Sequence, residues 1–509
     1  MAITKTFGIE TEYGIVHRGT EESNPISASS VLINSYLNSF GPDRGGLGRV
    51  GWDFEDEMPG NDARGLAPIG SMPPEIETHL VNAVLTNGAR YYVDHAHPEM
   101  STPECADPLS VVRYDKAGEL IAIASMEAAN AFLPDGEELV VYKNNSDGKG
   151  NSYGTHENYL MDRLCPFGRI VTHGTAHLIT RQIFTGSGKV GTEAIGLNRY
   201  DIPFQITQRA DFFEEEVGLE TTLKRPIINT RDEPHADAQK YRRLHVIAGD
   251  ANMCEVATFL KVGSTGLVLA MVEDDYIDRE FRFAAAVQTM RAVSYDLSMK
   301  DAYLLDDGTS ITALEVQWFY LDLARRYVDE RGADHVGGAD VTERVLARWE
   351  TVLTDLEQDP SRLTGQLDWV TKYELLQNYR DRHGLDWDDA RLAAMDIQYH
   401  DLRPAKSLFA RLSPEILVDE ESARSAMTDP PDDTRAYFRG ECLRRWAPSI
   451  VAANWDSLVF DTGTEPLRRI PMLEPTRGTR AHVGTLLEEC ATPAELVSRL
   501  DGASQGGEA

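Results

Sequence analysis

Two glutamates near the N-terminus give the first indication of chemistry in this chain. Glu10 and Glu12 stand two residues apart in the β-prone string FGIETEYGIV. Side chains two residues apart on a strand point to the same face, so both carboxylates would enter one space. Like charges repel there and burial is costly, a conflict that a divalent cation such as Mg²⁺ or Mn²⁺ resolves. An isolated pair of this kind is also typical of a solvated strand face.

A second string adds residues suited to phosphate and acid–base chemistry. In ARYYVD, strand alternation places Arg90, Tyr92 and Asp94 on one face. An arginine can hold phosphate oxygens in a planar fork, and a carboxylate at a strand end can act as base, nucleophile or metal ligand. A surface ion pair between Arg90 and Asp94 is the alternative. Glu99 follows in an expected loop and is a further candidate ligand.

Two histidines extend this set of residues. His156 lies in NSYGTHENYLM, where alternation groups it with Gly154 and Asn158, and His245 lies in RRLHVIAGD. A single strand histidine is more often structural, but neutral imidazoles beside two carboxylates fit a divalent metal site. Several arginines are candidates either for phosphate binding or for ordinary ion pairs with neighbouring acids: Arg225, Arg231, Arg242 and Arg243.

Composition limits the possible classes of protein. The 509 residues include 50 Lys and Arg against 82 Asp and Glu, and the net charge of −32 argues against nucleic-acid binding. Five scattered cysteines without a CxxC pattern predict reduced thiols. Because we find no signal peptide and no apolar run of transmembrane length, we expect a soluble, cytoplasmic protein with no membrane partner. No Walker A, GxGxxG, HExxH or GxSxG pattern occurs.

The elements expected to position these residues are strands in the first half of the chain and helices in the second. Strands are predicted around the strings above and in ELVVYKNN, and an Ala-rich helix over 115–133. The Gly- and acid-rich range 41–75 has no clear period, which predicts a functional or flexible loop. Its apolar residues Trp52, Phe54 and Met58 either dock it or occur by chance. Helical spacing predicts further helices over 279–297, 314–331, 341–358, 366–382 and 386–398.

Taken in order, these strings resemble the glutamine-synthetase-like carboxylate–amine family, and more closely its Pup ligase/depupylase branch. The strings that carry the resemblance are GIETEYG, NGARYYVDHAHPE, GKGNSYGTHENYL, RPIINTRDEPHADAQKYRRLHVIAGDANMCE and ANWDSLVF. The resemblance implies an α+β fold with a curved antiparallel β-sheet cradle, backed by helices, and a small C-terminal domain. A composition break at TDPPDDT divides the catalytic domain, 1–430 with 41–75 as a flexible insertion loop, from the C-terminal domain, 431–509.

The resemblance also implies roles for individual residues, with ATP and Mg²⁺ (or Mn²⁺) as cofactors in the cradle. The metal ligands would form two sets of three: Glu10, Tyr92 and Glu99, and Glu12, His156 and His245. The positions that match nucleotide contacts are Arg90, Thr102 and Trp455, and the phosphate-binding candidates Arg231 and Arg243 are added to the nucleotide-binding set. Asp94 matches the aspartate on which both members of the branch depend.

The two members of this branch catalyse opposite reactions at the C-terminal residue of the small protein Pup. The ligase consumes ATP to join Pup to a substrate lysine, whereas the depupylase hydrolyses that isopeptide bond and deamidates a C-terminal Gln of Pup to Glu. The insertion at 41–75 and the string DHAHPE resemble the depupylase. The resemblance thus implies an amide hydrolase that uses ATP as a cofactor and has Pup and pupylated proteins as partners.

Several alternatives stay open at this point. Asp94 would attack the carbonyl directly or act as base for water or for phosphate. A Pup–protein ligase of the same fold, a generic carboxylate–amine ligase and a catalytically silent Pup-binding adaptor are the other functions to consider. The adaptor would be expected to have lost Glu10, Asp94 or the histidines, and all of them are present.

Overall fold

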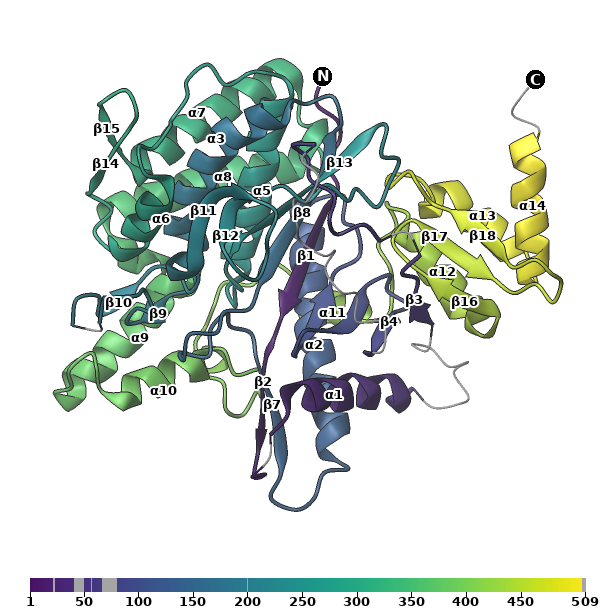
Figure 1. Cartoon of the computed structure of the whole chain (residues 1–509), viewed down its shortest axis with the longest axis horizontal. Helices are drawn as coiled ribbons and strands as arrows, with labels where there is room; N and C mark the ends of the chain where they lie inside the picture. The colour runs from purple at the N-terminus through teal and green to yellow at the C-terminus, as the bar shows by residue number, and fades with distance from the viewer. Residues whose placement is uncertain (22, 41–49, 56, 66–79, 199, 506–509) are drawn as a thin grey trace.

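The computed structural model describes every residue except 22, 41–49, 56, 66–79, 199 and 506–509. A ten-stranded sheet runs through the molecule (Figure 1). Its strands lie in the order β13 (Tyr241–Gly249), β8 (Thr155–Asp162), β1 (Phe7–Glu12), β6 (His97–Ser101), β5 (Arg90–Asp94), β4 (Asn82–Val84), β3 (Gly51–Trp52), β16 (Ile450–Ala453), β17 (Ser457–Phe460) and β18 (Arg468–Pro471). Neighbours are antiparallel except β3 and β16, which are parallel. The α+β class is confirmed, in a sheet that is mixed at one pair of strands.

Strand alternation in β1 decides which side of the sheet carries the glutamates. Phe7, Ile9 and Thr11 are buried, whereas the residues between them are half-buried on the opposite face. The buried side packs against α2 (Pro108–Asn130), and β8 packs against α5 (Glu255–Glu273). Phe7 also meets Tyr159 of β8 edge-on, with ring centroids 5.9 Å apart. The apolar residues therefore bind the sheet to the helices and leave Glu10 and Glu12 on the open face.

Four smaller sheets flank the large one. They pair β2 (Gly14–Arg18) with β7 (Glu138–Tyr142), β9 (Lys189–Val190) with β10 (Phe204–Gln205), β11 (Phe213–Gly218) with β12 (Arg225–Asn229), and β14 (Ala302–Leu304) with β15 (Ser310–Thr312). The strands predicted in ELVVYKNN and NSYGTHENYLM are present as β7 and β8 but lie in different sheets.

Most predicted helices are present. The helices other than α2 and α5 are α1 (Pro25–Ser39), α3 (Phe167–Thr180), α4 (Gln182–Thr185), α6 (Ala286–Tyr295), α7 (Ala313–Arg331), α8 (Ala339–Gln358), α9 (Asp368–His383), α10 (Ala390–Tyr399), α11 (Glu420–Ser425), α12 (Ala436–Trp446), α13 (Arg480–Glu489) and α14 (Pro493–Gln505). The helix predicted over 115–133 begins earlier because Asp107 caps it through the N–H groups of Leu109 and Ser110. The prediction of helix from 279 is wrong before Ala286, because Phe283 forms a β-bridge with Leu305 instead.

Helices α3 and α5 were not predicted, and α5 is buried along almost its entire length. A helix that is apolar all round shows no periodic pattern for a sequence reader to detect. Among the described residues, α5 is the one helix long and apolar enough to span a membrane, and that window is 100% buried inside the protein. Helix α5 therefore forms part of the protein core. All five cysteines are buried and form no disulfide.

The C-terminal residues extend the large sheet and surround a second hydrophobic core. Strands β16 to β18 and helices α12 to α14 lie together on one side of the molecule, coloured yellow, opposite α3, α7 and α8 (Figure 1). Their apolar side chains cluster with Val50, Trp52 and Val84 from earlier in the chain. The division into 1–430 and 431–509 stays a prediction.

The predicted loop over 41–75 is partly described. Within it, Gly51–Trp52 form β3, so the prediction of an aperiodic loop is wrong there. Trp52 is only 6% exposed and meets Trp455 edge-on at 5.3 Å between ring centroids, whereas Met58 is 59% exposed. Trp52 thus docks the segment onto the second core. The ranges 41–49 and 66–79 lie outside the described residues, and flexibility of the loop remains a prediction.

Candidate active site

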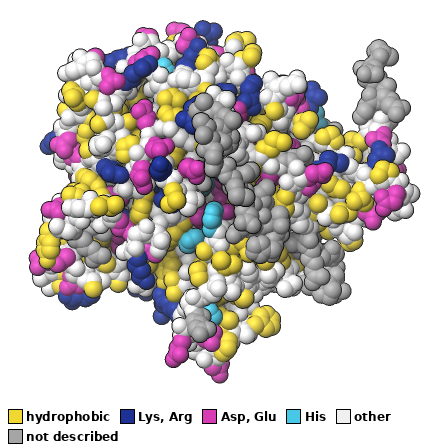
Figure 2. All heavy atoms as spheres, in the orientation of Figure 1, with side chains coloured by type: hydrophobic (Ala, Val, Ile, Leu, Met, Phe, Trp, Pro, Cys, Tyr) yellow, Lys and Arg dark blue, Asp and Glu magenta, His cyan; other side chains and the backbone are white. Residues whose placement is uncertain are grey.

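Five neighbouring strands bring the predicted residues onto one face of the sheet. Glu10 of β1 lies opposite His156 of β8 and Ser101 of β6, and Glu12 lies opposite Glu99 of β6. Directly opposed residues of antiparallel strands share a face. The same face of the sheet also carries four residues of the two outer strands, β5 and β13: Arg90, Tyr92, Arg243 and His245. Figure 2 shows histidine side chains at the surface near the centre of the same view, with acidic and basic side chains mixed elsewhere.

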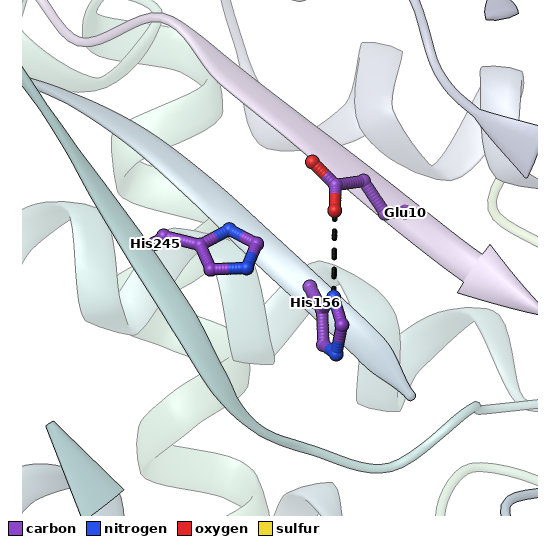
Figure 3. A group of neighbouring side chains, drawn as sticks. All are labelled: Glu10, His156 and His245. Carbon is purple, nitrogen blue, oxygen red and sulfur yellow. Dashed lines mark hydrogen bonds and ion pairs between the residues drawn. The ribbon is translucent and has the colours of Figure 1, made fainter. Parts of the chain in front are cut away.

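One group of candidate ligands consists of Glu10, His156 and His245. One ligand atom from each lies within 4.8 Å of the other two. Figure 3 shows the carboxylate of Glu10 above the His156 ring, with the His245 ring beside them, and the Glu10 Oε2 to His156 Nδ1 distance is 3.4 Å. The two rings meet edge-on, 5.0 Å apart. A carboxylate and two imidazoles at this spacing can hold a divalent cation.

Asn158 orients this group, although it was not among the predicted site residues. Its Nδ2 donates to Glu10 Oε1 at 2.9 Å, and its Oδ1 lies 3.0 Å from His245 Nδ1. Arg243 Nη1 donates to the same Asn158 oxygen at 2.7 Å and lies 3.2 Å from His245 Nδ1, so the amide and the guanidinium together hold the ring in place. Burial holds the pKa of His245 well below its usual value; the charge of Glu10 opposes this shift and that of Arg243 adds to it, and the ring is neutral. Strand alternation in the sequence places Asn158 on the same face as His156, and this pattern could have identified it as a site residue.

A second group consists of Glu12, Asp94 and Glu99, again with one atom of each within 4.8 Å of the others. Glu99 was expected in a loop but lies inside β6 and is 2% exposed. Burial raises its pKa well above the usual value, and the charges of Asp94 and Glu12 add to the shift. Three carboxylates this close together are stabilised by a cation, so this donor set also fits Mg²⁺.

The grouping of ligands differs from the one that the family resemblance implies. Glu10 lies with the two histidines, and Glu99 lies with Glu12 and Asp94. His156 connects the groups, because its Nε2 is 4.0 Å from Glu12 Oε1. Tyr92 pairs directly with Glu99 across β5 and β6 and so lies beside the second group. Burial, followed by the charge of Glu99, raises its pKa well above the usual value and keeps it a neutral phenol.

Asp94 is the last residue of β5 and begins the turn to β6. The next residue, His95, has a φ of 51°, a left-handed conformation uncommon outside glycine, and its Nδ1 lies 2.9 Å from Asp94 Oδ2. Burial alone would raise the pKa of Asp94, but this hydrogen bond and the charge of His95 lower it below its usual value. The carboxylate is therefore ionised at neutral pH, as a base or nucleophile requires.

Two hollows open on either side of these groups. The first, on the Glu10 side, is lined by three of the predicted nucleotide contacts, Thr102, Arg243 and Trp455. The second is lined by Glu12, Asp94 and His156. Glu10 lines the first hollow, and Glu12 and Asp94 line the second. We name these spaces the Glu10 hollow and the Asp94 hollow.

Arg90 and Arg231 are not among the described residues that line the Glu10 hollow. The Arg90 guanidinium is held between two rings, 3.9 Å from the Trp52 centroid and 4.0 Å from the Tyr92 centroid. Its Nε donates to Asn82 Oδ1 at 2.9 Å. The buried Nε of Arg231 has no hydrogen-bond partner among the described residues. Their proposed contact with nucleotide stays a prediction.

A comparison with known proteins places this arrangement in a family. The family described as Pup-ligase protein matches residues 5–459. The chain belongs to this family. Among curated relatives, the depupylase of Acidothermus cellulolyticus is 50% identical, covering 98% of this chain and 99% of the relative. The Pup deamidase/depupylase of Mycolicibacterium smegmatis is 47% identical, covering 97% and 99%.

More distant members of the Pup-ligase family include Pup–protein ligases. That of Arthrobacter sp. is 41% identical, covering 87% of this chain and 89% of the relative. A crystal structure of the ligase PafA with Pup has a TM-score of 0.79 at 30% identity, covering 99% of this chain and 95% of that one. PafA in complex with ADP has a TM-score of 0.71 at 34% identity, covering 80% and 89%.

The sequence did not identify Arg209, which lines the Asp94 hollow with Arg225. Arg209 follows strand β10 in a segment without clear periodicity, and its string QRAD matches none of the motifs considered. The string itself therefore gave no signal. Its neighbours at Ser152 and Ile247 come from distant parts of the chain, so only the folded structure reveals its position.

Proposed function

We propose that the protein is a Pup deamidase/depupylase. It hydrolyses the isopeptide bond between the C-terminal Glu side chain of Pup and a substrate lysine, and converts a C-terminal Gln of Pup to Glu. The observation that carries this proposal is the similarity over nearly the whole chain, 50% and 47%, to relatives named for these activities. The Pup–protein ligase relative is less similar, 41% over 87% of the chain.

The two ligand groups support a role for Mg²⁺ with ATP. Glu10, His156 and His245 would hold one ion, and Glu12 and Glu99 a second beside Asp94. When bound, such ions would neutralise phosphate charge and polarise a carbonyl oxygen. Thr102, Arg243 and Trp455 would hold the nucleotide in the Glu10 hollow. The ADP-bound relative supports nucleotide binding by this fold.

Asp94 is the residue that we assign to the reaction itself. Its ionised carboxylate lines the Asp94 hollow, where a terminal Glu or Gln side chain would enter. Acting as base, it takes a proton from water while the hydroxyl adds to the amide carbon, and the leaving amine receives a proton as the C–N bond breaks. Acting as nucleophile, it adds to the amide carbon, the C–N bond breaks as the amine leaves with a proton, and water then hydrolyses the resulting anhydride. In both routes amide hydrolysis is downhill, so ATP is a cofactor and not a fuel.

The test is incubation of the protein with a Pup conjugate, with and without ATP and Mg²⁺, followed by gel electrophoresis. We expect release of intact substrate and of Pup, and deamidation of Pup ending in Gln, without one ATP consumed for each bond. The second candidate is Pup–protein ligation, favoured by the likeness to PafA. Formation of conjugate from Pup ending in Glu, with matched ATP hydrolysis, would show that our assignment is wrong.

The five buried thiols support the accompanying proposal of a cytoplasmic location.

A further inference from the structure

Two arginines in the Asp94 hollow form no ion pair with any acid in the described part of the chain. Arg209 is 2% exposed, and Arg225 is half-buried beside it. Both line the Asp94 hollow, and neither forms an ion pair within the part of the chain that the structure describes. A buried guanidinium without a counter-anion is costly, because it loses its hydration without gaining a charge partner. The pair therefore has an unmet requirement for negative charge.

The hydrogen bonds of both guanidinium groups fix their positions without neutralising them. Arg209 donates through Nη1 to the Ile247 carbonyl and through Nε to Ser152 Oγ, 3.3 Å away. Arg225 donates through Nη2 to the Ser152 carbonyl at 2.9 Å and through Nε to the Thr221 carbonyl at 3.0 Å. All of these acceptors are neutral. One nitrogen of each group, Nη2 of Arg209 and Nη1 of Arg225, makes no hydrogen bond with a described residue.

The local electrostatics point the same way. Burial, and then the charge of Arg225, lower the pKa of Arg209 to about 10. Glu12 is the acid whose charge acts on both arginines. Its Oε1 already accepts the Gly154 N–H at 2.8 Å, and its carboxylate belongs to a candidate metal group. Asp250 also acts on Arg209 and Glu214 on Arg225, but neither acid forms an ion pair with them among the described residues. An anion from a ligand would balance the two adjacent positive charges directly.

The substrate of the proposed function supplies such an anion. When the scissile amide is on the side chain of a C-terminal residue, the α-carboxylate of that residue is free and lies near the reacting carbonyl. Guanidinium forks match carboxylates in shape and charge. We propose that Arg209 and Arg225 bind the α-carboxylate of the C-terminal residue of Pup and so restrict the reaction to the chain end. This inference rests on the proposed function.

The test compares two synthetic peptides of the Pup C-terminal segment ending in Gln, one with a free α-carboxylate and one with an α-carboxamide. Their binding is measured by calorimetry with ADP and Mg²⁺ present. Charge-assisted hydrogen bonds of this kind correspond to about 10- to 100-fold in affinity, so the parent protein should bind the carboxamide that much more weakly. Arg225→Gln should lose most of this preference, because only Arg209 would remain to bind the α-carboxylate.

Arg403→Gln is the matched control. Arg403 also lines the Asp94 hollow but is paired with Asp401 and Glu138, so its loss should leave discrimination between the peptides intact. Thermal denaturation reports whether each variant is folded. Arg225 is used first because Arg209 is deeply buried, and Arg225→Lys, which keeps the charge but not the fork, should retain part of the discrimination.

Three outcomes would overturn the inference. The parent binds both peptides equally, or Arg225→Gln discriminates between them as strongly as the parent, or inorganic phosphate binding is lost in Arg225→Gln while discrimination stays at the parent's level. The last result would identify a phosphate site instead. Failure of the proposed function is distinct, because the parent would then release no Pup from a conjugate and deamidate no Pup ending in Gln.

Discussion

The backbone N–H of Gly154 donates a 2.8 Å hydrogen bond to Oε1 of Glu12. This bond connects the start of β8 to the candidate ligand groups and leaves no room for a side chain. A Cβ at position 154 would lie 2.2 Å from His156 Nε2 and 2.7 Å from Glu12 Oε1. Glycine is thus required here by the close approach of two functional side chains rather than by its backbone conformation.

The first prediction follows from this contact. Gly154→Ala should displace Glu12 and His156, and weaken Mg²⁺-dependent nucleotide binding and turnover by at least about 10-fold while the protein stays folded. Calorimetry with ADP at several Mg²⁺ concentrations measures the effect. Gly168→Ala on α3 is the control, because its Cβ would meet nothing within 4 Å. Equal metal dependence in the two variants would contradict the proposed ligand positions.

The second prediction concerns Asn158, which orients His245 and Glu10 together. Asn158→Ala should lower the affinity for Mg²⁺ or Mn²⁺ by about 10- to 100-fold, since the partners that hold metal ligands have effects of this size. Titration of the divalent ion, followed by ADP binding, provides the measurement. Asn34→Ala, at an exposed position on α1, is the control. An unchanged titration would mean that Asn158 is merely structural.

The third prediction concerns Asp94. Asp94→Asn keeps the size of the side chain but removes its charge and basicity, so conjugate cleavage should fall by about 10²- to 10⁴-fold. ADP binding should survive, because Asp94 does not line the Glu10 hollow. Single-turnover cleavage of a Pup conjugate, beside ADP calorimetry, separates the two effects. Asp135→Asn, at an exposed position, is the control, and near-parental cleavage by Asp94→Asn would exclude a chemical role.

Much of the candidate site could be predicted from the sequence because strand alternation is purely geometric. A period of two places Glu10 with Glu12, and Arg90 with Tyr92 and Asp94, whatever the rest of the fold. The grouping of ligands could not be predicted in this way. It depends on β1 lying between β8 and β6, an arrangement set by contacts between residues far apart in the chain.

Two strands of the large sheet, β6 and β3, were not predicted, and their local sequences explain why. Strand β6 was missed because it contains Pro98, and proline is unusual in a central strand except near its beginning, where it lies here. Strand β3 was missed because two residues give too short a pattern to detect. Its pairing with β16 depends on the C-terminal part of the chain. The pairing of strands that are far apart in the chain decides the geometry of the site, and it cannot be predicted from one short segment of sequence.

The last prediction concerns Arg90, whose guanidinium lies between the rings of Trp52 and Tyr92. Trp52→Leu keeps an apolar side chain in the second core but removes one ring from Arg90. Loss of one cation–π contact should weaken ADP binding by about 3- to 10-fold.

Calorimetry with ADP on the parent, Trp52→Leu, Arg90→Ala and the double variant would measure this coupling. Because Trp52 also touches Trp455, a predicted nucleotide contact, the single variant alone is ambiguous. If Trp52 acts by holding Arg90, its substitution has no further effect once Arg90 is alanine. An equal loss in both backgrounds would instead assign the effect to Trp455 and would show that Trp52 does not act through Arg90.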